Sequence, residues 1–334
     1  MCRLTAKFEI TLPRYIRVRR APEDELRYSA TMDGFDIEII LIPNGGARGR
    51  HNDDIHETRK ISRIKLSVSR DEESAPPDIE VNSSGHRDLS ERSAWFSGRL
   101  GEYRAVALKA VNRLIRFFKY DLRVPILREI HVSDSQFTNP TWVDTNNSEH
   151  DSGIHELSSP IVPPRGPELV GEKDLTEHSD VMVQNVLQND ISIEIYQEFF
   201  ADAQTSIVNG KLHRAILEMA IACEVAIKQL FLRETAIAGA EDEHLEPTRR
   251  VDLRAIDLIH IAAKVDFGES FKDIEVIAYS HIDYLFRSRN KVAHIGKAIY
   301  HDDGGGEYTV DRHCLEDWWP SVELLMDWIE QHQN

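Results

Sequence analysis

The chain has 334 residues, 41% of them hydrophobic and 29% charged, which is room for two globular domains. Its formal net charge of −17 argues against a protein that covers nucleic acid with its whole surface. No run approaches the roughly 18 to 20 apolar residues of a membrane span, and no apolar block of signal-peptide length opens the chain, so no membrane contact is expected. Three dispersed cysteines, Cys2, Cys223 and Cys314, exclude a disulfide scaffold and a thiolate zinc site and favour a reducing, cytoplasmic location.

The charge changes character twice along the chain. The balance of basic and acidic residues is +4 over the first 133 residues, −8 over residues 134–180 and −13 beyond them. Such changes indicate domain boundaries. We expect an α+β domain over residues 1–133, an acidic, proline-rich linker over 134–184 and a helical domain over 185–334.

The N-terminal part has the pattern of strands followed by one helix. Alternation typical of half-buried antiparallel strands occurs in residues 7–12, 15–19, 34–42 and 61–69. Residues 99–120 carry an apolar stripe at helical spacing, and a last strand over 126–132 is expected to return to the sheet. The predicted fold is a mixed antiparallel β domain with one main helix.

Two features of this part have both a functional and a plain interpretation. Five cations outside the apolar stripe of residues 99–120 could follow a phosphate backbone, but no aromatic residue is interleaved to stack a base, so we favour a solvated face. The cluster of His51, Asp53, Asp54, His56 and Glu57 has metal-binding residue types. A polar loop is favoured there because no second ligand group is in view. No metal or cofactor is expected.

The C-terminal part is helical throughout. The spacing of apolar residues predicts helices over 191–208, 211–235, 251–265, 271–293 and 315–332. A triple glycine at 304–306 predicts a small hairpin within residues 299–312. Short connections between such helices are typical of an all-α, up-down helical bundle.

The fourth of these helices ends with polar residues on one face. At about 100° per residue, Asn290 and His294 share a face, and Arg287 falls nearly in line with them. Gly296 offers a C-cap just beyond. Arginine, amide and imidazole side chains at a helix end suit a phosphate diester, because they can hold the phosphate, orient an oxygen and move a proton near neutral pH. No metal is needed if the attacking group is the 2′-hydroxyl of RNA.

The segment Arg289-Asn290-Lys291-Val292-Ala293-His294 resembles the RNxxxH form of the R-x4-6-H motif of HEPN domains. Its setting is similar too: a late helix of a bundle, a glycine-bearing hairpin and a closing helix. Residues 200–230, with Ala222-Cys223-Glu224, resemble the opening helices of such domains. The resemblance covers about residues 185–334, and the N-terminal half is not recognised.

Active members of that family are metal-independent endoribonucleases in which two motifs meet at a dimer interface, and many act in antiviral defence or as toxins. The resemblance implies that Arg289 binds the phosphate, Asn290 orients it and His294 transfers the proton. Arg287 offers an alternative R-x6-H spacing. Lys291 would add positive charge to the dimer cleft.

Glu224 lies in an otherwise apolar stretch of its helix, where a carboxylate usually has a partner or faces a cavity. We interpret it as a structural acid, with a supporting role in the site as the alternative. The partners implied by the resemblance are RNA and a second copy of the chain, with a trigger or inhibitor protein acting through an N-terminal sensor or regulatory domain.

Two further hypotheses compete with a nuclease. The bundle can be a non-catalytic HEPN-like module that dimerises or holds a ligand or partner, which suits the acidity of this half better. Alternatively, Arg289 and His294 are ordinary helix-end residues that neutralise the last carbonyl groups.

Overall fold

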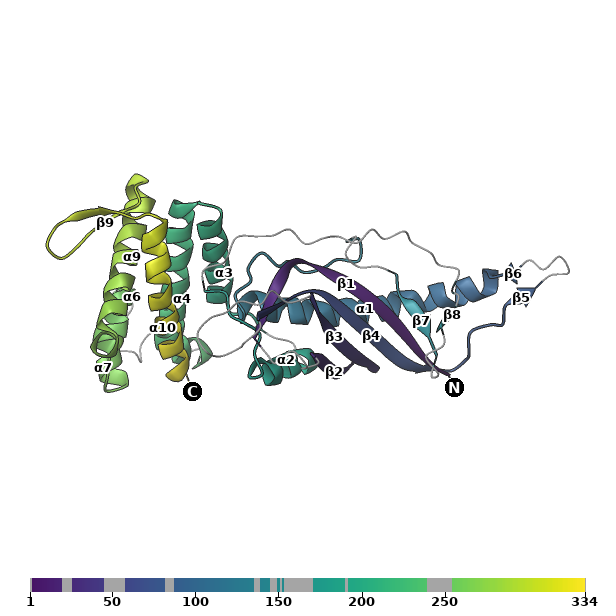
Figure 1. Cartoon of the computed structure of the whole chain (residues 1–334). Helices are drawn as coiled ribbons and strands as arrows, with labels where there is room; N and C mark the ends of the chain where they lie inside the picture. Colours follow the sequence, from purple (N-terminus) through teal and green to yellow (C-terminus); the bar gives the residue numbers. More distant parts are fainter. Residues whose placement is uncertain are drawn as a thin grey trace. The chain divides into compact units, whose positions relative to one another are not determined.

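The structure is a computed structural model, shown in Figure 1. It describes residues 2–19, 26–44, 58–81, 87–134, 139–144, 149–150, 152, 171–189, 192–238 and 254–333. The chain divides into two compact units. The first comprises Met1–Gly166 and Lys173–Ser192, and the second comprises Pro167–Glu172 and Ile193–Asn334. None of the described helices is both long enough and apolar enough to cross a membrane.

The first unit is built on an antiparallel sheet. Its strands are β1 (Cys2–Arg19), β2 (Arg27–Met32), β3 (Phe35–Asn44), β4 (Thr58–Glu72), β7 (Thr141–Val143) and β8 (Glu149–His150). Among the described residues these form one six-stranded sheet in the order β2-β3-β4-β1-β7-β8. A separate two-stranded pair joins β5 (Glu80–Val81) to β6 (Arg87–Asp88). The predicted antiparallel sheet is confirmed.

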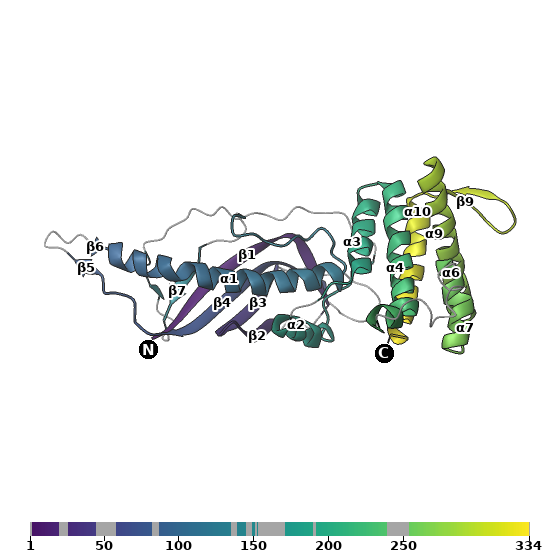
Figure 2. The same cartoon turned by 180° about the vertical axis from the view of Figure 1, so that it is seen from behind.

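One face of the sheet is covered by the long helix α1 (Ser90–Tyr120), as Figures 1 and 2 show. From Leu4 to Val18, even-numbered residues of β1 are buried and odd-numbered ones are not, because successive side chains of a strand point to opposite faces. Tyr103 of α1 packs edge-on against Phe35 of β3 and Trp142 of β7, with ring centroids 4.9 and 5.0 Å apart. The core therefore lies between α1 and the inner face of the sheet.

The strand expected over residues 126–132 is absent, and this prediction was wrong. The side chain of Asn112 on α1 donates to the carbonyl oxygen of Ile130 at 3.0 Å and accepts from the Ile130 amide at 2.8 Å. A side chain thus satisfies the backbone groups that a neighbouring strand would otherwise pair. The other strand predictions hold, although residues 7–12 and 15–19 belong to one strand whose pairing with β4 shifts between Thr11 and Ile16.

Part of the segment expected as a linker is folded into the first unit. Strands β7 and β8 extend the sheet, and helix α2 (Ser179–Gln188) packs beside β2. The Tyr28 hydroxyl on β2 donates to Asp180 at 2.8 Å, and Arg113 of α1 donates to the carbonyl oxygen of Leu187 at 2.8 Å. After α2, the chain enters the second unit for the last time between residues 192 and 193.

The second unit consists of helices and one small hairpin. The helices are α3 (Ile195–Val208), α4 (Leu212–Ala238), α6 (Ala255–Asp257), the π-helix η2 (Leu258–Ala262), α7 (Ala263–Asp266), α8 (Phe271–Ile274), α9 (Val276–Ile295) and α10 (Arg312–Gln331). The hairpin joins β9 (Ile299–His301) to β10 (Glu307–Thr309). Apolar side chains of α4, α9 and α10 share one core, which includes Ile216, Cys223, Leu285 and Trp318.

The helices of this unit follow the predicted order with small shifts. The predicted helix over 271–293 is interrupted at Glu275, which separates α8 from α9. The helix predicted over 251–265 is described from residue 255 and contains a π-helical turn. The hairpin expected around the triple glycine is present, and Gly305 has a φ of 83° that a residue with a side chain rarely adopts.

Candidate active site on helix α9

The last two turns of α9 carry the predicted motif at the surface of the second unit. Gly296 ends the helix with a φ of 66°, and its amide donates to the carbonyl oxygen of Val292 at 3.0 Å. This is the predicted glycine C-cap. Asn290 and His294 are both exposed and lie four residues apart, so their side chains are neighbours on one face of the helix.

Arg289 is held by an acid from another helix. Its Nη2 lies 2.9 Å from Oε2 of Glu224 on α4, and its Nη1 donates to Oδ1 of Asn290 at 3.1 Å. The other carboxylate oxygen of Glu224 accepts from Lys228 at 2.7 Å. Glu224 therefore has the partner expected of it, although its side chain is 26% exposed rather than fully buried. The three charged groups together carry one positive charge.

Arg287 is engaged differently from Arg289. Its guanidinium forms ion pairs with Asp283, one turn earlier on α9, at 2.5 Å and with Asp303 of the hairpin at 2.7 Å. It also donates to the carbonyl oxygen of His301 at 2.9 Å. The hydrogen bond to Asp303, with that to Asp283, raises the pKa of Arg287 above its ordinary value. Arg287 thus fastens the hairpin to α9, an arrangement that sequence spacing does not reveal.

His294 and Lys291 are available to a ligand. Within the described parts of the chain, neither side chain has a hydrogen-bond or ion-pair partner. No contact joins Arg289 or His294 to a carbonyl oxygen of the last turn there, which is the contact that a purely helix-capping role would require. The motif therefore presents an open imidazole and ammonium beside a guanidinium that is already oriented.

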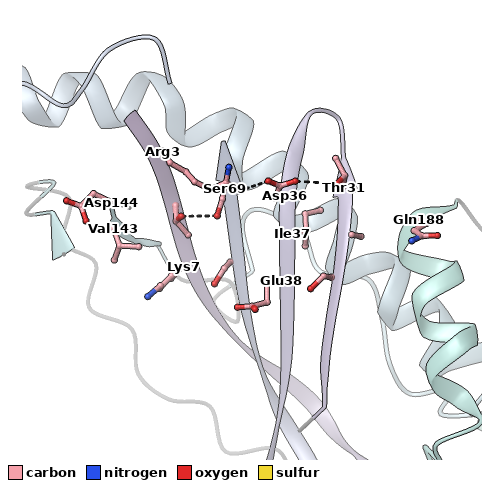
Figure 3. Close-up of a pocket in the computed structure, with 14 residues that line it drawn as sticks. Arg3, Lys7, Thr31, Asp36, Ile37, Glu38, Ser69, Val143, Asp144 and Gln188 are labelled. Carbon is pink, nitrogen blue, oxygen red and sulfur yellow. Dashed lines mark hydrogen bonds and ion pairs between the residues drawn. The ribbon is translucent and has the colours of Figure 1, made fainter. Parts of the chain in front are cut away.

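A second feature, which sequence reasoning missed, is a hollow of about 670 Å³ on the outer face of the sheet in the first unit (Figure 3). The register aligns Ser29, Glu38, Ser67 and Lys7 across four strands, and short hydroxyl side chains leave space between longer charged ones. Serine and threonine at alternate positions of neighbouring strands were the signal for it. Two of its acids are already paired, Asp36 with Arg3 and Glu38 with Arg27.

Metal-binding clusters are not found within the described ranges, where no group of three or more His, Cys, Asp or Glu side chains could hold an ion. The polar loop of His51–Glu57 predicted from the sequence lies outside those ranges. In comparisons with known proteins, no family model, curated protein or solved structure matches the chain.

Proposed function

We propose that the second unit is a HEPN-like, metal-independent endoribonuclease whose motif is Arg289, Asn290 and His294. The observation that carries the proposal is the exposed His294 and Asn290 on the last turns of α9, beside an Arg289 oriented by Glu224. Pre-orientation matters because a catalytic group held in place need not be reorganised during the reaction. The up-down, HEPN-like arrangement of the helices is part of the same proposal.

The proposed reaction is a transesterification. The 2′-oxygen of one nucleotide forms a bond to the adjacent phosphorus while the bond from phosphorus to the 5′-oxygen breaks. One proton leaves the 2′-hydroxyl and one is delivered to the departing 5′-oxygen, so the products are a 2′,3′-cyclic phosphate and a 5′-hydroxyl. Arg289 stabilises the charge on the phosphate, Asn290 orients an oxygen and His294 moves a proton.

Two copies of the chain are proposed to form the site together. Removing one proton and delivering another is served best by two groups, and one chain offers a single histidine in the motif. A homodimer through the C-terminal helices would pair the two motifs and pool Arg289 and Lys291 from both chains. Pooled cations would offset locally the charge of −13 over residues 181–334.

The first unit is proposed to sense a trigger or to bind an inhibitor, and so to regulate the nuclease in antiviral defence or a toxin-like role. Its hollow in the sheet offers a place for such a regulator. A cytoplasmic location is proposed with this role. The three cysteines are free thiols, which suits a reducing compartment.

The test is cleavage of labelled RNA in EDTA by the wild-type protein, His294→Ala and the control His213→Ala, which removes an exposed histidine from the start of α4. We expect cleavage by the wild type and the control, and none by His294→Ala. A substrate with a single 2′-deoxynucleotide should resist cleavage at that position only. Equal cleavage by His294→Ala would overturn the proposed role.

Mixing wild-type and His294→Ala chains tests the shared site. Because the proposed site takes one histidine from each chain, a dimer with a single His294→Ala chain is expected to be inactive, so activity after subunit exchange should fall with the square of the wild-type fraction. A fall in direct proportion to that fraction would contradict a site shared in this way.

A second candidate function is a non-catalytic binding module. The observation that favours it is that both motif-region arginines are already paired with acids of the same unit, Arg289 with Glu224 and Arg287 with Asp283 and Asp303. This candidate predicts saturable partner or ligand binding without RNA turnover. Absence of cleavage by the full chain and by residues 193–334 alone, under conditions where both are folded, would favour it.

A further inference from the structure

Three tyrosine rings stack between α9 and the hairpin of the second unit. The rings of Tyr284 and Tyr300 lie 4.6 Å apart at an interplanar angle of 25°, and those of Tyr300 and Tyr308 lie 5.3 Å apart at 18°. Trp318 of α10 meets Tyr300 edge-on at 5.6 Å. The stack therefore begins at the helical core and ends at Tyr308 on β10, in the hairpin seen beside α9 in Figure 1.

The outer ring is held in place by the loop of the hairpin. Asp302 accepts the amide proton of Gly306 at 2.7 Å, and its nearby carboxylate raises the pKa of the Tyr308 hydroxyl. A Cβ at Gly306 would lie 3.0 Å from Cε2 of Tyr308, so a larger residue there would push the ring aside. Gly306 thus allows the Tyr308 ring to pack closely against the loop.

The two ends of the stack differ. At the inner end, the guanidinium of Arg287 lies 5.9 Å from the centroid of the Tyr284 ring, within the range of a cation–π contact. At the outer end, Tyr308 is 48% exposed although Tyr300 covers one of its faces. Nearly half of the surface of Tyr308 is therefore open to solvent and to a ligand.

The charge around the open face is negative. Residues 299–311 include four acids, Asp302, Asp303, Glu307 and Asp311, and neither lysine nor arginine. The side chain of Asp303, which pairs with Arg287, is 85% exposed, whereas Glu307 precedes Tyr308 in the strand and points to the other face, near His301. Phosphate groups would be repelled from such a surface, whereas a guanidinium or ammonium group would be attracted to it.

We propose that the open face of Tyr308 and the acidic hairpin around it bind an arginine side chain from a basic segment of a partner protein. The arginine would stack on Tyr308 as Arg287 stacks on Tyr284, with the hairpin carboxylates balancing its charge. This surface goes beyond the proposed nuclease function and does not depend on it. Because Arg287 ties the hairpin to α9, a partner bound there would lie next to the helix that carries His294.

The experiment measures binding of a fluorescent glycine–serine peptide with arginine at alternate positions to the full chain at low salt. The matched peptide carries citrulline, which has a similar shape but no charge. We expect the arginine peptide to bind and the citrulline peptide not to bind. Tyr308→Ala should weaken binding about 2- to 30-fold, the range that a cation–π contact of about 0.5 to 2 kcal/mol implies.

Three variants serve as controls. Tyr308→Phe keeps the ring and should retain most of the affinity, and Thr309→Ala, the next residue of the strand, whose side chain points to the other face, should change nothing. His294→Ala should bind the peptide normally, so the peptide-binding proposal can hold even if the nuclease proposal fails.

Four results would overturn the proposal. The first is no binding by the wild type, and the second is equal binding of the citrulline peptide. The third is unchanged peptide affinity in Tyr308→Ala. The fourth is a Tyr308→Ala variant that binds the peptide normally but has lost binding of single-stranded RNA. The last result would identify the stack as a platform for nucleobases. Thermal melting of each variant confirms that it is folded.

Discussion

Arg289 of α9 and Glu224 of α4 form an ion pair of 2.9 Å that joins the motif to a helix 65 residues earlier in the chain. The acid orients the guanidinium and also offsets part of its charge. These two effects can be separated, because glutamine keeps an oxygen that accepts the hydrogen bond but has no charge.

We expect Glu224→Gln to tighten RNA binding and to steepen the slope of log affinity against log salt by about 0.7, one additional phosphate contact on a single strand. The measurement uses a His294→Ala background, so that cleavage does not interfere. Asp327→Asn, which removes an exposed carboxylate of α10, is the matched control. An equal change in both variants would mean a general charge effect rather than a local one.

Arg287→Ala should loosen the hairpin rather than abolish catalysis. The substitution removes the contacts to Asp283, Asp303 and the carbonyl oxygen of His301. We expect faster hydrogen exchange in residues 299–310 and a loss of about 1 kcal/mol, a small value because solvent screens these partly exposed ion pairs. Arg312→Ala, which breaks a pair within α10, is the control. Unchanged hairpin exchange together with lost cleavage would instead give Arg287 the phosphate-binding role.

Glu72→Ala should destabilise the first unit strongly. The buried carboxylate accepts hydrogen bonds from Arg70, Arg99 and Tyr103 at 2.8 to 3.1 Å. Burial alone would raise the pKa of Glu72, but these donors outweigh burial and lower it. Removing the acid leaves two cations without their shared partner, so urea denaturation should show a loss of about 3 kcal/mol. Glu102→Ala, which removes an exposed partner of Arg70, should cost less than about 1 kcal/mol.

Lowering the pH should destabilise the protein partly through protonation of His281. Burial lowers the pKa of His281 below its ordinary value of 6.5, and its Nδ1 lies 2.8 Å from the Ser321 hydroxyl. The unfolded chain therefore takes up this proton more readily than the folded one. The corresponding stability is complete above pH 6.5 and is lost as the pH falls towards the folded-state pKa. Melting temperatures of His281→Gln should fall less steeply below pH 6.5 than those of the wild type.

The regular parts of the fold could be predicted because their patterns are local. Alternation identified β3 and β4, and apolar spacing identified α1 and the helices of the second unit. The prediction of a strand over residues 126–132 failed because the backbone there is held by the side chain of Asn112. No periodicity in the sequence reveals such a contact. Helix α2 was missed because it is short and lies within an acidic, proline-rich stretch.

The candidate site was predictable only in part, for a similar reason. Helical periodicity placed Asn290 and His294 on one face, and the glycine after them indicated the helix end. The pairing of Arg289 with Glu224 joins two separate helices, and that of Arg287 with Asp303 joins a helix to a hairpin turn. Such contacts depend on how elements pack, so the different partners of two arginines two residues apart emerged only from the structure.

The central position of β1 in its sheet has a consequence for folding on the ribosome. Ala6 of β1 pairs with Trp142 of β7, 136 residues further along the chain. At ~5 to 20 residues per second, synthesis of that length takes roughly 7 to 30 s. Until β7 emerges, one edge of β1 has no partner and can pair with another chain. We therefore expect the newly made first unit to depend on a chaperone more than the helical unit, whose packed helices lie closer together in the chain.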